Sequence, residues 1–134
     1  NLGDRKGALR SLDEALAVIQ DLGTEVSDTR AEIHLLAAGI HFALGASEAA
    51  EAAVGAARRA AETIADPHKR RYRRVEANCR HGAILQEKGD IDGALARLRA
   101  AETALGELEA ARASLTGALV RVEGLLARYT HSDT

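Results

Sequence analysis

Small and aliphatic residues recur along this chain at steps of three and four positions, in three stretches that each follow a glycine. Counting onward from Gly3, Gly45 and Gly89, the fifth residue is Ala in every stretch, the ninth is Leu or Val, and the twelfth is again Ala. Such steps place side chains on one face of an α-helix. The three glycines stand 42 and then 44 residues apart, so the pattern predicts a repeated pair of helices joined by glycine turns.

The turns and apolar faces together predict six helices. They are expected over residues 4–22, 27–44, 47–65, 67–88, 90–107 and 109–130. Asp4 and Asp90 are suited to capping the free N–H groups at a helix start, and Asp66 followed by Pro67 marks another start. Hydrophobic residues make up 46% of the chain and aromatic residues only 2%. A core of small aliphatic side chains of this kind favours an all-α fold over a β-sandwich.

Small residues also stand on both sides of the turns, where two antiparallel helices would approach each other. Ala38 is seven positions before the second glycine and Ala50 five positions after it; Gly82 and Ala94 hold the same places around the third. This pattern resembles the tetratricopeptide repeat, in its longer variant of about 42–44 residues. The resemblance covers nearly the whole chain and implies one right-handed α-solenoid over residues 1–134. Its repeat units would be near 1–26, 27–66, 67–108 and 109–134.

The resemblance also implies a function. In that family, partner peptides lie against a concave wall built from the first helix of each pair. Carried over by distance from each turn, the groove positions are Glu32, Leu35, Phe42, Tyr72, Arg73, Glu76, Arg121 and Arg128. We therefore expect a module that binds a protein, a peptide or another domain of a longer chain. Such arrays often regulate an output domain, which implies the regulatory or sensory part of a bacterial signalling or transcription-regulating protein.

A run of cations stands out in a chain whose net charge is -2. Its members are Lys69, Arg70, Arg71, Arg73 and Arg74. Three interpretations are open. The cations could be solvated and balance acidic neighbours, they could dock an acidic protein segment, or they could contact nucleic acid. The alternative function for the chain is thus a nucleic-acid-binding helical domain that uses residues 69–74. It is the weakest of the three interpretations, because only one helix is basic and stacking aromatics are nearly absent.

The remaining residues do not indicate catalysis or a cofactor. No triad-like arrangement, phosphate-binding glycine loop or metal-ligand spacing occurs, so we expect no enzyme activity, metal or cofactor. The single Cys79 excludes an internal disulfide. No membrane-spanning stretch or signal peptide is present, which favours the cytoplasm. The absence of Met suggests a piece of a longer chain, and the exposed solenoid ends make a homodimer plausible.

Overall fold

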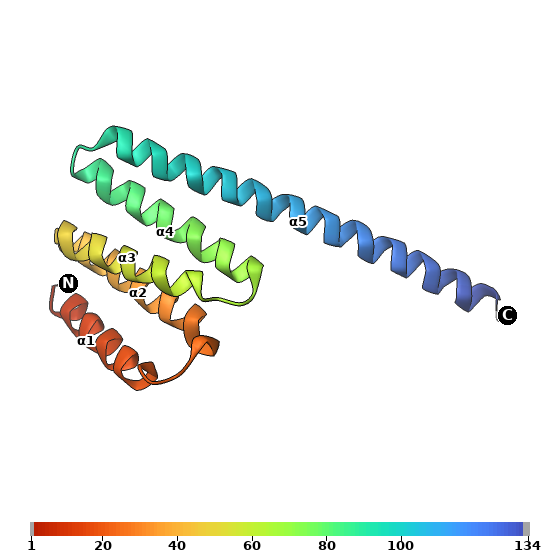
Figure 1. The fold of residues 1–134 in the computed structure, drawn as a ribbon, viewed down its shortest axis with the longest axis horizontal. Helices are drawn as coiled ribbons and strands as arrows, with labels where there is room; N and C mark the ends of the chain where they lie inside the picture. The colour runs from red at the N-terminus through yellow and green to blue at the C-terminus, as the bar shows by residue number, and fades with distance from the viewer. Residues whose placement is uncertain (1, 133–134) are drawn as a thin grey trace.

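The computed structural model describes residues 2–132, and this part of the chain is all-helical, with no strand. Five α-helices are joined by short connections, one of which holds the 3-10 turn Thr24–Val26. Their bounds are α1 Leu2–Ile19, α2 Ser27–Ala43, α3 Ser47–Glu62, α4 Pro67–Glu87 and α5 Ile91–Ser132. The helices α1 to α4 lie side by side, and α5 runs along α4 and then continues well beyond it (Figure 1). The all-α prediction is confirmed.

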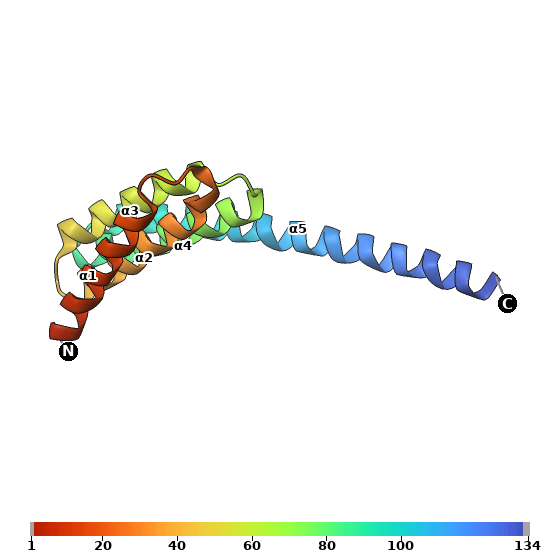
Figure 2. The ribbon, with the colours of Figure 1, turned by 90° about the horizontal axis from the view of Figure 1, so that it is seen from below.

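Two helical hairpins form the centre of the structure. Helix α2 packs chiefly on α3, and α4 packs chiefly on α5; α4 also contacts both helices of the preceding hairpin, and α1 contacts α2. The turned view shows α1 to α4 gathered at one end and the far part of α5 extending away from them (Figure 2). Each hairpin therefore has a tight internal contact and a looser contact to the neighbouring helices.

The hairpin turns owe their shape to two of the glycines that define the repeat. Gly45 and Gly89 have φ angles of +77° and +85°, in the left-handed region where a side chain would be strained. After α2, the N–H of Ala46 donates to the carbonyl of His41 at 2.9 Å, as in a Schellman motif, and the equivalent bond closes α4. The predicted turns at these two glycines are confirmed.

Aspartates begin the last two helices, as expected. The Oδ1 of Asp66 accepts a hydrogen bond from the N–H of His68 at 2.9 Å, with Pro67 in the first helical turn. The Oδ1 of Asp90 accepts one from the N–H of Gly93, also at 2.9 Å. Each bond satisfies an N–H group that has no partner within the helix.

The core is made of small and aliphatic side chains, most of them from the repeated faces. Its central cluster contains Leu35, Ala38, Ala50, Val54, Ala57, Ala77 and Ile84. Ala38 and Ala50, the small residues predicted to face each other across the first hairpin, are both fully buried. In the second hairpin, a Cβ added to Gly82 would stand 3.0 Å from the side chain of Leu98. Close packing of α4 on α5 thus depends on the missing side chain at Gly82.

Three predictions about the helices are wrong. Instead of a fifth and a sixth helix separated near residue 108, α5 continues without a break from Ile91 to Ser132. The segment Ala104–Arg112 has helix-forming Leu, Glu, Ala and Arg around a lone Gly106, and no proline or capping residue to end the helix. The turn predicted at Gly3 is not formed, because Gly3 lies inside α1. The bounds predicted for that helix, 4–22, are also wrong, since α1 runs over 2–19. Residues 1, 133 and 134 of the predicted repeat units lie outside the described part.

Candidate functional site

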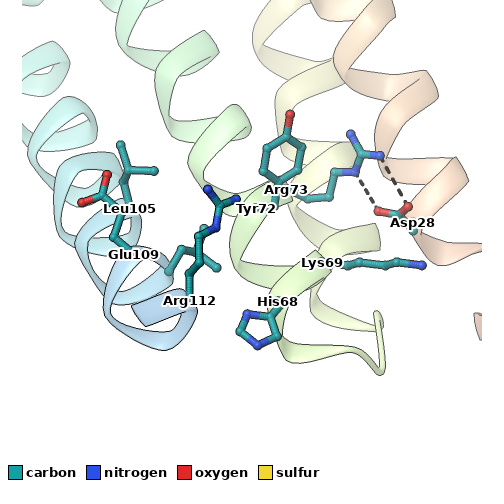
Figure 3. A pocket seen from close by; sticks show the side chains of 9 residues that line it. Asp28, His68, Lys69, Tyr72, Arg73, Leu105, Glu109 and Arg112 are labelled. Atoms are coloured by element: carbon teal, nitrogen blue, oxygen red, sulfur yellow. Dashed lines mark hydrogen bonds and ion pairs between the residues drawn. The ribbon is translucent and has the colours of Figure 1, made fainter. Parts of the chain in front are cut away.

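A groove of about 640 Å³ opens between the first turns of α4, the middle of α5 and the start of α2. Its walls carry Asp28 from α2; His68, Lys69, Tyr72 and Arg73 from α4; and Leu105, Leu108, Glu109 and Arg112 from α5. Figure 3 shows the side chains of α4 and α5 on opposite sides of this hollow, with Asp28 joined to Arg73. Three cations, two carboxylates, a histidine, an aromatic ring and two leucines thus surround one cavity.

Arg73 is the central charge of the α2 side of the groove. Its Nε donates to Oδ1 of Asp28 at 2.7 Å, and its two terminal nitrogens donate to Glu76 at 2.8 Å and Glu32 at 3.3 Å. Only 13% of its side chain is exposed. The hydrogen bond from Arg73 holds the pKa of Asp28 below its ordinary value, with help from the positive charges of Arg73 and Lys69, although burial acts in the opposite direction. This part of the groove is therefore an ionised, hydrogen-bonded network.

Other cations of the basic run are also used within the chain. Arg74 donates from Nε and a terminal nitrogen to the two carboxylate oxygens of Glu62, at 2.8 and 2.6 Å. Arg70 donates to the carbonyl of Ile64 at 2.9 Å, in the connection between α3 and α4. A guanidinium group that binds a carboxylate with two parallel bonds is both oriented and neutralised. Both arginines thus fasten the start of α4 to the end of α3.

The last two cations of the run lie toward α5 and the groove. Arg71 is 3.9 Å from Glu107, a distance at the limit of an ion pair between exposed side chains. Lys69 is exposed and lines the groove, where its charge contributes to the lowered pKa of Asp28. Within residues 2–132, Lys69 is the one member of the basic run for which no hydrogen bond or ion pair is found. Its ammonium group is free to meet a partner.

The structure brings together four of the residues predicted to form the concave groove. Tyr72 and Arg73 line the cavity, and Tyr72 is 55% exposed, with its ring centroid 5.5 Å from the guanidinium carbon of Arg73. Glu32 and Glu76 bind Arg73 from its two sides. The geometry therefore places an accessible aromatic ring beside the charge network of Arg73.

The other four predicted groove residues lie elsewhere. Leu35 is 3% exposed and belongs to the core, so the prediction that its side chain faces a partner needs correction. Its position on α2 directs the side chain toward α3 and α4, where it packs in the core cluster with small residues of those helices. Phe42 packs against the same cluster, partly buried. Arg121 and Arg128 are exposed on the far part of α5 and do not line the cavity.

Four groove residues could not be predicted from the sequence, because the repeat spacing predicts a turn near residue 108. They are Leu105, Leu108, Glu109 and Arg112. With α5 continuous, Leu108 falls on the same face as Leu105, one helical turn further on. A signal was present, since Leu105 occupies the repeated apolar position sixteen residues after Gly89. His68 was missed for a different reason, because its place at the start of α4 carries no sequence pattern of its own.

The described side chains give no support for a bound metal. Over residues 2–132, no group of three or more His, Cys, Asp or Glu side chains is arranged to hold a metal ion. None of the described helices contains a stretch long and apolar enough to cross a bilayer. No protein-family model, curated protein sequence or solved structure matches this chain. Any inference about its function therefore starts from the geometry of the groove.

Proposed function

We propose that this chain is a protein–protein interaction module with a tetratricopeptide-like solenoid arrangement, in which the groove between α4, α5 and α2 receives a segment of a partner protein. The hairpin order supports a solenoid, because α4 packs on both α2 and α3 in the way one repeat packs on the next. The two Schellman turns recur at the spacing of that repeat, and so do the buried small residues beside them, Ala38 with Ala50 and Gly82 with Ala94. Modules of this kind serve as regulatory or sensory parts of larger signalling proteins, and we propose that role here.

The observation that carries this proposal is the mixed chemistry of the groove. Tyr72, Leu105 and Leu108 offer apolar surface, while Lys69 and Arg112 stand exposed beside it. A cavity of about 640 Å³ is within the size range of sites that enclose a small ligand or a few side chains. The partner we propose is an extended segment with an apolar side chain next to a carboxylate. The apolar side chain would contact Tyr72 and the two leucines, and the carboxylate would pair with Lys69 or Arg112.

Peptide display against the whole chain tests this proposal. Peptides selected by the wild-type chain are expected to share an apolar residue next to an acidic one. Their dissociation constants are then measured by calorimetry with Tyr72→Ala and with the double variant Lys69→Glu, Arg112→Glu. We expect each variant to weaken binding by about tenfold or more, which corresponds to roughly 1.4 kcal/mol.

The matched control for the charge reversal is Lys6→Glu, at an exposed position on α1 that does not line the groove. It should bind the selected peptides as the wild-type chain does. Peptides that bind the groove variants as tightly as the wild-type chain would contradict the proposed site. A selection that yields no peptide at all would contradict the proposed function.

A further inference from the structure

The far part of α5 has no neighbour in the body of the structure. Helix α4 has 21 residues and α5 has 42, and the two run antiparallel from the turn at Gly89. The first residues of α4 therefore lie opposite the middle of α5. Residues 113–132 continue alone for about 30 Å at the usual rise per residue, and both views show this extension (Figures 1 and 2).

An apolar stripe on α5 forms its established contact with α4. Its members are Ala94, Leu98, Ala101, Leu105 and Leu108, at steps of four, three, four and three residues. Ala94 and Ala101 are each 4% exposed, and Leu98 packs against Gly82. Leu105 and Leu108 face the first turns of α4 across the groove.

The same stripe continues past the start of α4. After Arg112, it carries Leu115, Leu119, Val122, Leu126 and Tyr129, again at alternating steps of four and three. This is the spacing of a heptad repeat, whose mean of 3.5 residues per turn keeps an apolar seam facing a partner helix in a left-handed coiled coil. By sequence position, this seam is thus a direct continuation of the α4 and α5 interface.

The described apolar side chains of this extension are open to solvent. Leu119 and Val122 on the seam are both 53% exposed, and Val120 and Leu125 beside it are 62% and 54% exposed. Gly117 and Gly124 also lower the helix propensity of the segment. A single helix with two glycines has little stability of its own in water. Burial of its exposed apolar seam against a partner helix would stabilise it.

We infer that the partner is the same segment of a second copy of this chain, and that the two copies pair through residues 113–129. The positions that flank the seam are Thr116 and Glu123 on one edge and Ala118 and Leu125 on the other. Glu123 is the charged one, and in a parallel pair of identical helices it faces Ala118 of the other copy and no second carboxylate. Flanking charges are what select or reject partners in coiled coils, so an identical helix that runs parallel meets no repulsion here.

The charges of the extension disfavour a membrane surface as the occupant. Residues 113–132 contain Arg121, Glu123 and Arg128 and no Lys, so their polar face is mixed and close to neutral. Helices that lie on membranes carry a strongly basic polar face. The interface is separate from the groove between α4 and α5, and this inference therefore goes beyond the proposed function and can fail independently of it.

Sedimentation equilibrium of the whole chain tests the inference. Between roughly 1 and 200 µM, the mean mass should rise from the 14.1 kDa of one chain toward twice that value. Leu119→Glu should weaken this association by at least about tenfold. The control is Ser114→Glu, which adds the same charge at an exposed position off the seam, and it should associate as the wild-type chain does. Circular dichroism of both variants checks that the body remains folded.

Disulfide trapping provides a second measurement. In a Cys79→Ser background, Leu119→Cys should form covalent dimers under mild oxidation much faster than Ser114→Cys. A wild-type chain that stays monomeric at every concentration overturns the inference, including one that binds anionic phosphatidylglycerol vesicles instead. Equal association of Leu119→Glu and Ser114→Glu also overturns it.

Discussion

The Nε of Arg73 lies 2.7 Å from Oδ1 of Asp28, a contact that joins α4 to α2 across 45 residues of sequence. Two more carboxylates, those of Glu76 and Glu32, complete the shell of acceptors around this guanidinium group. A cation from the basic run thus holds two hairpins together. At Arg73, the basic run therefore stabilises the packing of α4 on α2.

Replacing Arg73 should therefore destabilise the fold. Arg73→Ala leaves Asp28 and Glu76 without their donor, and hydrogen bonds to charged groups contribute about 1.5–3 kcal/mol each. Because the carboxylates can regain water, we expect a net loss near the lower end of that range in the free energy of unfolding, measured by urea denaturation. Arg99→Ala, at an exposed position of α5, should change it by less than about 0.5 kcal/mol. Equal losses in the two variants would contradict the role assigned to Arg73.

Acidification from neutral pH should destabilise the fold through His81. Burial lowers the pKa of His81 first of all, followed by the charges of Arg97 and Arg58, while Glu51 acts in the opposite direction. The folded-state pKa thus lies below the ordinary value of 6.5, and the unfolded chain takes up protons more readily. The stability from the neutral ring is complete above pH 6.5 and is lost as the pH falls through the folded-state value.

The measurement is the free energy of unfolding between about pH 7.5 and 5. His81→Gln should make this profile shallower, since the neutral amide does not titrate, while His34, whose pKa burial also lowers, keeps part of the slope. Ser114→Gln, an uncharged exchange at an exposed position of α5, should leave the slope as it is in the wild-type chain. A wild-type profile that is flat over this range, or one that rises on acidification, would refute the sign of the effect.

The turn at Gly45 should tolerate no side chain without cost. Its φ of +77° is strained for alanine although nothing lies within 4 Å of an added Cβ, so Gly45→Ala should cost about 1–2 kcal/mol of unfolding free energy. The control is Gly55→Ala inside α3, where the added Cβ meets only the end of Arg59 at 3.5 Å. That variant should stabilise the chain by up to about 1 kcal/mol. Thermal unfolding distinguishes the two, and shifts of the same sign would be inconsistent with a conformational origin.

Enlarging Ala50 should disrupt the first hairpin. Ala50 is fully buried against the core that contains Ala38, and overpacking such a site costs about 1–3 kcal/mol. Ala50→Leu should therefore lower the midpoint of denaturation, whereas Ala52→Leu, two residues on at an exposed position of the same helix, should be nearly neutral. If Ala50→Leu were as stable as Ala52→Leu, a small side chain at position 50 would not be required for the packing of the hairpin.

We expect the chain to bind nucleic acid weakly or not at all. Arg70, Arg73 and Arg74 donate to groups within the chain, which leaves few cations to release counterions from phosphates. Fluorescence anisotropy with labelled single-stranded and duplex oligonucleotides at about 50 and 200 mM salt measures this. We expect at most weak binding at the lower salt and none at the higher. Tight binding that Arg74→Glu abolishes would favour the nucleic-acid alternative.

The fold and the site were predictable to different degrees. The positions of α2, α3 and α4, the two glycine turns and the caps at Asp66 and Asp90 follow from local signals, because each depends on residues within one or two helical turns of one another. The continuity of α5 was not predicted, since the repeat spacing suggested a turn that the residues around Gly106 do not make. The groove residues Leu108 and Arg112 were missed for the same reason.

The sequence by itself determined the helical class, the hairpin turns and the small-residue faces, because periodicity, left-handed glycines and capping carboxylates act over short distances along the chain. Only the tertiary structure decided the partners of the cations. The same run of arginines could face water, phosphate or carboxylates, and the choice depends on which helices pack beside α4. Stacking of α4 on α2 brings Asp28 to Arg73, and burial of that pair strengthens an attraction that would be weak in water.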